Sequence, residues 1–260
     1  MFKHIIAALS LLVVSATTHA QVVVVPPSLS PGDSYRLVFV TSTEDVASST
    51  DITTYDSIVQ AAAAGNTVLA GITWQVLGST DAVDAIDHTN TSPMAATQVP
   101  IFRLDGANVA NDYVDLWDDT INSPINIDES GATLSVEVWT GTAPDGTSNG
   151  GVFGLGTFSI PGPRFGFSGF TSSGWIIDGV NNVIFDRHFY GISNVLTVPG
   201  GPMGPLIGDA DLNGVVEFAD IPAFIAVLQS GVFLDEADIN RDGVVTFSDI
   251  APFIVVLSSQ

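Results

Sequence analysis

Short runs of β-branched and aromatic residues recur along the chain as far as residue 198, and Gly, Asn, Asp or Pro separate them. Such runs predict short β-strands. The clearest lie at 35–41, 73–77 and 99–104, and shorter apolar pieces at 134–140, 165–170 and 194–198 continue the pattern. Their number and brevity predict a sheet-rich region with long loops.

One stretch in this region has the period of a helix instead. Residues 53–64 are rich in alanine, and Gly65 follows them as a stop signal. The apolar residues fall on one helical face, formed by Tyr55, Ile58, Val59 and Ala62. One early helix among many short strands predicts an α+β fold, with a mostly β fold as the alternative.

The C-terminal part of the chain has a different pattern. Two almost wholly apolar segments, 221–228 and 250–257, predict helices, and each has its proline in the first turn, where a missing N–H costs little. Helices without a polar face must be covered on several sides, so these two either pack on each other or leave one face open to a partner. The expected partner-binding residues are Phe218, Phe224, Phe247 and Phe253.

Each apolar segment directly follows one copy of a twelve-residue pattern, at 209–220 and 238–249. Oxygen-bearing side chains occupy positions 1, 3, 5, 9 and 12, Gly occupies position 6, and position 7 offers a backbone carbonyl. This is the ligand order of a calcium-binding EF-hand loop. The expected ligands are Asp209, Asp211, Asn213, Val215, Glu217 and Asp220, and then Asp238, Asn240, Asp242, Val244, Thr246 and Asp249.

Two features distinguish this pair from ordinary EF-hands. Position 12 is Asp in both copies, and the Gly/Pro-rich stretch before Asp209 cannot form an entering helix. A tandem of such loop-then-helix units, covering 207–260, resembles a dockerin type I-like module. The resemblance implies two bound Ca²⁺ ions and docking to a cohesin-like or other extracellular protein receptor.

The charge balance narrows the choice of partners. The chain has 28 Asp and Glu against 6 Lys and Arg, for a formal net charge of −22. The only lysine is Lys3, so the chain after residue 20 holds five arginines against 28 carboxylates, or −23. Without a cationic patch we expect neither nucleic-acid binding nor adhesion to anionic lipid.

The first twenty residues have the pattern of a secretory signal peptide. Lys3 and His4 precede an apolar run at 5–14, and small residues precede a cleavage site after Ala20. That run is too short to span a bilayer, and we expect no span elsewhere. The chain has no cysteine, so stability must come from core burial and metal binding. We expect a secreted or cell-surface protein.

A Gly/Pro-rich linker at 199–206 is expected to separate the C-terminal module from a large domain at 21–198. Within that domain, the Trp-Thr-Gly-Thr sequence that begins at Trp139 and the Asp-Gly that begins at Asp145 are the most specific parts of a weaker resemblance. Residues 35–198 resemble a family of secreted bacterial domains of uncharacterised function with a C-type-lectin-like fold. The resemblance implies recognition of an extracellular ligand such as a carbohydrate, with Trp117 and Asp118 as the candidate ligand-binding residues.

Signals for catalysis are sparse. Only His88 and His188 remain after residue 20, too few for a zinc site made of several histidines. No Gly-x-Ser-x-Gly motif is present, so the nucleophile turn of a hydrolase is not indicated. Asp84, Asp87 and His88 form a local group with acid/base chemistry, although acidic residues mostly occupy loops here. We therefore expect a non-catalytic recognition or attachment protein. The alternatives are a polysaccharide-degrading enzyme that carries a dockerin, or a structural component of a matrix or envelope.

Overall fold

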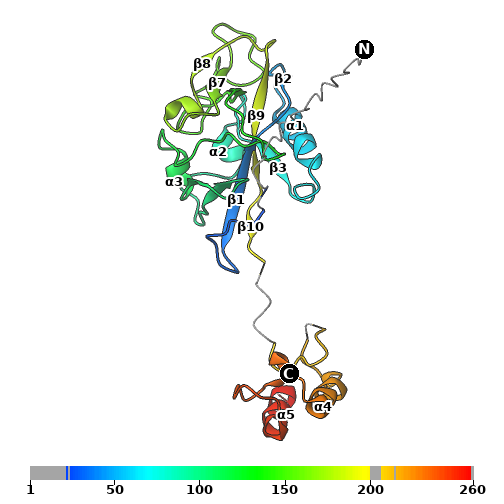
Figure 1. The fold of residues 1–260 in the computed structure, drawn as a ribbon. Coiled ribbons are helices and arrows are strands. Elements are labelled where there is room, and N and C mark those ends of the chain that lie inside the picture. Colours follow the sequence, from blue (N-terminus) through cyan, green and yellow to red (C-terminus); the bar gives the residue numbers. More distant parts are fainter. Residues whose placement is uncertain (1–21, 23, 200–205, 214, 259–260) are drawn as a thin grey trace, which may run out of the picture. The chain divides into compact units, whose positions relative to one another are not determined.

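The computed structural model describes residues 22, 24–199, 206–213 and 215–258. The chain divides into two compact units, with the boundary between Val198 and Pro199 (Figure 1). The predicted signal peptide at 1–20, most of the predicted linker, and Gly214 lie outside the described residues. No described helix is long and apolar enough to cross a membrane.

The large unit contains both helices and strands, which confirms the α+β prediction at that level. Its strands are β1 (Ser34–Val40), β2 (Asp45–Val46), β3 (Trp74–Val76), β4 (Ile101–Arg103), β5 (Asn108–Ala110), β6 (Glu137–Trp139), β7 (Arg164–Phe167), β8 (Gly179–Val180), β9 (Asp186–Ser193) and β10 (Leu196–Thr197). Its helical segments are α1 (Ile52–Ala64), α2 (Ala85–His88), α3 (Tyr113–Leu116) and the 3₁₀ turn η1 (Ser173–Trp175).

The ten strands form one mixed sheet in which β9 is central. The main order is β5-β4-β1-β9-β6-β7-β8, while β10 pairs with β1, and β2 and β3 pair with β9. Strand β9 runs antiparallel to β1 and parallel to β6. Figure 1 shows β1 and β9 as the two long strands that run through the unit, with α1 beside them.

Strand β1 is buried on both faces because alternate side chains point to opposite sides of the sheet. Leu37 and Phe39 belong to one core cluster, and Val38 and Val40 belong to another. Helix α1 covers the first cluster with Tyr55, Val59 and Ala63. The helix predicted at 53–64 is thus confirmed.

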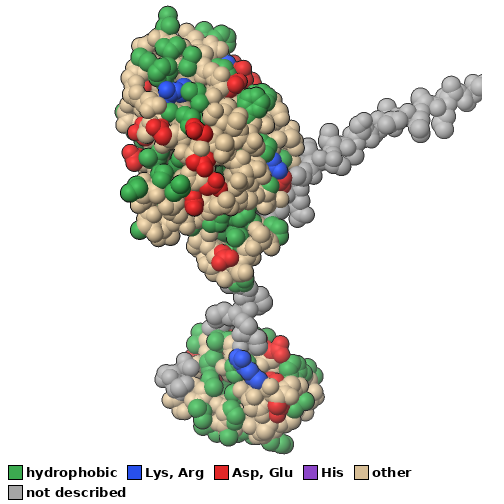
Figure 2. All heavy atoms as spheres, turned by 90° about the vertical axis from the view of Figure 1, so that its left-hand side faces the viewer, with side chains coloured by type: hydrophobic (Ala, Val, Ile, Leu, Met, Phe, Trp, Pro, Cys, Tyr) green, Lys and Arg blue, Asp and Glu red, His purple; other side chains and the backbone are tan. Residues whose placement is uncertain are grey.

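The arginines of the large unit lie inside it. Arg36, Arg164 and Arg187 are each less than 8% exposed, and each guanidinium stacks on at least one aromatic ring. Arg103 is held in an ion pair with Asp105 at 2.6 Å. Residues 22–198 contain 19 acids and these four arginines, so the outward-facing charge is almost entirely negative. Figure 2 shows acidic side chains spread over one face of this unit.

The small unit consists of two loops and two helices around a core of its own. Its elements are α4 (Asp220–Ser230), the 3₁₀ turns η2 (Asp235–Ala237) and η3 (Phe247–Asp249), and α5 (Ile250–Ser258). Phe224 of α4 stacks on Phe253 of α5 at the centre of that core. The packing of the two apolar helices on each other is therefore confirmed.

Candidate functional site

The first acidic loop brings three carboxylates together immediately before α4. Oxygen atoms of Asp209, Asp211 and Asp220 lie within 4.8 Å of one another. Asp209 is 4% exposed and Asp220 is fully buried, whereas Asp211 faces solvent. Within the described ranges, no second group of three acidic, His or Cys side chains comes this close. Buried carboxylates at this spacing repel one another unless a cation or proton is present.

Backbone N–H groups fix these carboxylates in place. The amide of Asp211 donates to Asp220 Oδ1 at 3.0 Å, and the amide of Glu217 donates to Asp220 Oδ2 at 2.8 Å. The amide of Asn213 donates to Asp209 Oδ1, also at 3.0 Å. Positions 1 and 12 of the pattern are thereby held by the amides of positions 3, 5 and 9.

The second loop repeats these bonds at the equivalent positions, 29 residues further along the chain. The amide of Asn240 donates to Asp249 Oδ1 at 3.1 Å, and that of Thr246 donates to Asp249 Oδ2 at 2.9 Å. The amide of Asp242 donates to Asp238 Oδ1 at 3.1 Å. Two loops with different sequences thus form the same set of bonds, which indicates one loop conformation specified twice.

The backbone turns at the same point in both loops. Leu212 and Arg241, each at position 4, have φ of 61° and 59°, in the left-handed region. At position 6, Gly243 has φ of 89°, a conformation that strains any residue with a Cβ atom. This is the sharp central turn that the glycine at position 6 predicts.

The two loops differ in the side chains that they offer. Asp211 occupies position 3 of the first loop, and Asn240 takes its place in the second. The Asn240 side-chain amide donates to Asp242 Oδ2 at 3.0 Å and to Ser248 Oγ at 2.9 Å. In the first loop, the Asn213 side-chain amide donates to Asp211 Oδ2 at 3.1 Å. Positions 3 and 5 exchange Asp and Asn between the loops, and the charge differs at position 9, where the first loop has Glu217 and the second has Thr246. The first loop therefore carries four carboxylates and the second carries three.

The electrostatics of the first loop favour a cation. Incomplete hydration raises the pKa of the Asp211 carboxyl, and the negative charges of Asp220 and Asp209 raise it further. A hydrogen bond from the Asn213 amide acts in the opposite direction. The net rise means that this cluster resists carrying its full negative charge, and a bound cation would remove that resistance.

The expected docking phenylalanines fall into two classes. Phe224 and Phe253 are 2% and 3% exposed and belong to the core of the small unit. Phe218 and Phe247, which precede the helices, are 73% and 82% exposed. Of the four expected docking residues, two therefore lie on the surface and two lie in the interior.

An apolar groove lies between α4 and α5, with a volume of about 320 Å³. Its lining has no polar side chain and consists of Ile221, Phe224, Ile225 and Leu228 from α4, with Ile250, Phe253, Ile254 and Leu257 from α5. The four residues from each helix are the same four types at equivalent positions. Ile225 and Ile254 were not among the expected docking residues, although their spacing from Ile221 and Ile250 could have indicated this face.

The large unit does not present Trp117 as a stacking surface. Trp117 is 7% exposed, its Nε1 donates to the carbonyl and hydroxyl of Thr91, and its ring lies 6.0 Å from that of Trp175. Asp118 is exposed, and its Oδ1 accepts bonds from the amide and hydroxyl of Thr120. The tryptophan therefore belongs to the core, as Trp74, Trp139 and Trp175 do.

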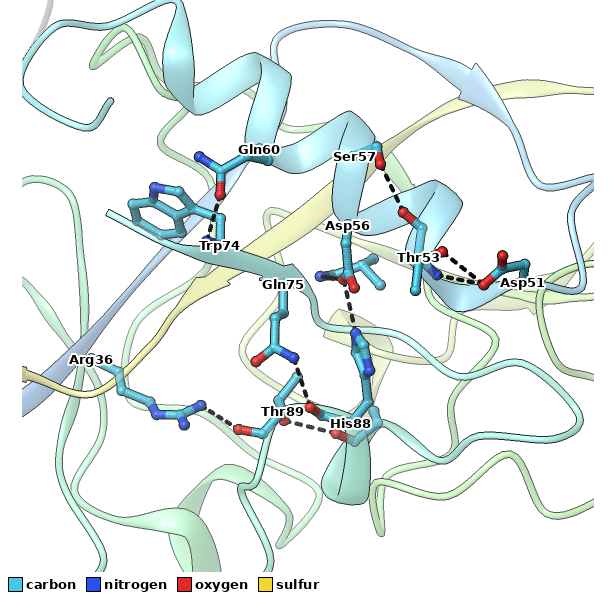
Figure 3. Close-up of polar contacts among 12 residues, drawn as sticks. Arg36, Asp51, Thr53, Asp56, Ser57, Gln60, Trp74, Gln75, His88 and Thr89 are labelled. Carbon is cyan, nitrogen blue, oxygen red and sulfur yellow. Dashed lines mark hydrogen bonds and ion pairs between the residues drawn. The ribbon is translucent and has the colours of Figure 1, made fainter. Parts of the chain in front are cut away.

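The group of Asp84, Asp87 and His88 is not brought together as an acid/base site. His88 Nε2 lies 2.8 Å from Asp56 Oδ1, and that same oxygen accepts a bond from the Val76 amide (Figure 3). Asp84 Oδ1 instead accepts a bond from the Ser148 amide at 2.6 Å. These contacts join α1, α2, β3 and a distant loop, so they serve the fold. No local sequence signal connects Asp56 to His88.

A polar hollow of about 410 Å³ lies beside the end of α1. Its lining includes Asn66, Thr67, Glu129 and Ser130. The Glu129 carboxylate accepts bonds from the amide and hydroxyl of Ser42, and the Asn66 side chain donates to the Glu129 carbonyl at 2.7 Å. These polar groups already have partners within the chain, which leaves little for a ligand to satisfy.

The chain matches no protein-family model, and no curated protein is similar to it.

Proposed function

We propose that the protein is an exported, non-catalytic attachment protein whose small unit is a dockerin-like module for two Ca²⁺ ions. The observation that carries the proposal is the repeated set of amide-to-carboxylate bonds in the two loops. A chance pair of Asp-rich turns would not reproduce the same donors, acceptors and left-handed residue at equivalent positions. Calcium-binding loops require such a repeatable, preformed arrangement of oxygens.

The donor set fits a hard divalent cation. Every expected ligand atom is an oxygen, and the pattern supplies no sulfur or imidazole nitrogen. In the first loop the ion would be held by Asp209, Asp211, Asn213, Glu217, Asp220 and the carbonyl of Val215. In the second loop it would be held by Asp238, Asn240, Asp242, Thr246, Asp249 and the carbonyl of Val244. Calcium would supply positive charge that offsets the repulsion among these carboxylates.

Calcium would also couple the loops to the helices. Asp220 is the first residue of α4, and Asp249 immediately precedes α5, so a ligand at position 12 fixes where each helix begins. Without the ion, the buried and mutually repelling carboxylates favour opening of the loop. The helices and the groove between them would then lose their anchor points. The apolar face is therefore proposed to be available to a partner only in the calcium-bound module.

The large unit is proposed to be a lectin-like recognition domain for an extracellular ligand, with carbohydrate as one class. Its buried arginines and anionic surface argue against nucleic acid as that ligand. Together the two units would join an extracellular ligand to a cohesin-like or other protein receptor, in the medium or at the cell surface.

The proposal is tested by following the helical circular dichroism of the full chain in chelator and after calcium is added. We expect a gain of helical signal with calcium and little change with magnesium, which loses its water reluctantly. A spectrum that is the same in chelator and in calcium would contradict the coupling between ion and fold.

A further inference from the structure

Each groove helix continues a series of apolar residues that begins just before it in the sequence, here called its strip. Phe218, Ile221 and Ile225 follow one another at intervals of three and four residues, and Phe247, Ile250 and Ile254 repeat those intervals. The two isoleucines of each strip share one face of α4 or α5, Phe218 precedes α4, and Phe247 lies in the 3₁₀ turn before α5. The phenylalanines are the most exposed members, at 73% and 82%. The surface thus has a hollow in the middle and a protruding aromatic side chain from each repeat.

The amount of exposed apolar surface is unusual for this chain. Half of its exposed large hydrophobic residues, 11 of 22, lie in the small unit, which is about a fifth of the described sequence. A fully exposed side chain of this size offers on the order of 200 Å². The exposed fractions of Phe218, Phe247, Ile221, Ile225 and Ile254 therefore correspond to about 600 Å² of exposed surface. A stable interface needs about 800 Å² per partner, and weak, reversible interfaces bury about 600 Å² or less.

The distribution of charge indicates what kind of surface would cover this face. The small unit holds nine acids and one arginine, yet no ionisable side chain lines the groove. Asp220 and Asp249, the acids nearest the helix starts, are fully buried. A basic partner would therefore find no carboxylate in the groove. An uncharged, apolar surface matches it better.

The internal repeat makes such a surface available on the chain itself. A symmetric dimer brings the same patch of both subunits together, so that patch must be self-complementary. The small unit has two equivalent strips, and the equivalent residues Phe224 and Phe253 meet at 4.2 Å where the strips join. Each copy offers protruding phenylalanines and a hollow that can receive one.

We propose that the groove and its strips bind a second copy of the chain, and form a reversible homodimer when both calcium loops are filled. The inference rests on the proposed calcium-dependent module and names the partner of its apolar face. The acidic modules repel each other, and bound calcium promotes the contact because it neutralises part of their negative charge. Added NaCl strengthens it by screening the remaining repulsion. A contact with a basic partner would show the opposite dependence on salt.

The test is sedimentation equilibrium of the full mature chain over about a hundredfold range of concentration. In calcium, we expect the average mass to rise toward that of a dimer as the concentration rises, and to rise further when NaCl is added. In chelator, we expect the average mass to stay at that of a monomer. A monomer in calcium at every concentration would overturn the inference, as would a dimer that persists in chelator or weakens with NaCl.

Matched variants locate the interface. Ile225→Ser with Ile254→Ser changes two exposed groove residues, whereas Val232→Ser with Val255→Ser changes two residues that are more exposed but do not line the groove. We expect the first pair to lower the dimer association constant at least tenfold and the second pair to leave it within about twofold. Equal effects from the two pairs would overturn the inference. Calorimetry on the same samples separates the two proposals, since calcium binding by a chain that stays monomeric refutes only the dimer.

Discussion

The rings of Phe224 and Phe253 stack with their centroids 4.2 Å apart and their planes 26° apart. These residues occupy equivalent positions in the two repeats, and together they fill the centre of the small core. Their contact joins one calcium-loop unit to the other. The two helices therefore share one core.

We predict that Phe224→Ala destabilises the small unit far more than Ile225→Ser does. The first substitution leaves a cavity in the core and costs about 3 kcal/mol or more of unfolding free energy. The second removes an exposed side chain and costs less than about 1 kcal/mol. Urea unfolding of the full chain in calcium, followed by helical circular dichroism, measures both. Equal losses would contradict the assignment of Phe224 to the core.

We predict that Gly243→Ala weakens the second loop through the backbone alone. A Cβ atom there meets nothing within 4 Å, but φ is 89°, so the cost is conformational and amounts to about 1–2 kcal/mol. Gly243→Asn should cost less, because Asn tolerates positive φ better. Calorimetric calcium affinities of the two variants give the comparison. If both variants bound calcium with the affinity of the natural protein, the glycine at this turn would not be required.

We predict that Asp56 stabilises the large unit and has no part in acid/base chemistry. Asp56→Ala leaves His88 and the Val76 amide without their shared acceptor and should cost about 1–3 kcal/mol. Asp87→Ala is the matched control, because Asp87 is exposed and its removal should change the unfolding free energy by less than about 0.5 kcal/mol. Thermal unfolding of both variants tests this, and an unchanged midpoint for Asp56→Ala would contradict it.

The ion pair of Arg103 and Asp105 should make the large unit sensitive to acid. Burial opposes ionisation of Asp105, but bonds from Arg103 and nearby amides outweigh it and lower the pKa of the carboxyl. A carboxyl whose pKa is lower in the folded protein than in the unfolded chain stabilises the fold fully when the pH is above its unfolded pKa. That stabilisation is lost as the pH falls through the folded pKa. Asp105→Asn should thus be about 1 kcal/mol less stable than the natural protein near neutral pH.

This difference should shrink as the pH falls below about 4, where the Asp105 carboxyl takes up its proton. Urea unfolding of the two proteins at a series of pH values measures it. A difference that is constant from neutral pH down to pH values well below the usual range of Asp would show that the ion pair is not its source.

The sequence predicts features whose causes lie within a few residues. Helix α1, strand β1 and the order of residues in the acidic loops follow from local spacing. The left-handed residue at position 4 and the turn at Gly243 also lie inside one such loop. Contacts between distant segments have no such signal. The pairing of Val38 with Ile192 and the bond of His88 to Asp56 depend on how the chain returns to itself.

Besides long-range contacts, the local sequence pattern does not predict which apolar side chains are buried. Trp117 stands among acids in the sequence, yet its ring is buried against Trp175, which lies far along the chain. Phe224 and Phe218 look alike as apolar residues near one helix, but only Phe224 faces the other repeat. A helix that is apolar on every side does not reveal which face is covered.

Calorimetric calcium titration of the chain from residue 21 onward tests most directly the proposal that two loops of the same conformation each bind one calcium ion. We expect two ions per natural chain and one ion per chain for Asp220→Asn and for Asp249→Asn, since each substitution weakens one loop. Two ions bound by either variant, or none by the natural protein, would contradict the account.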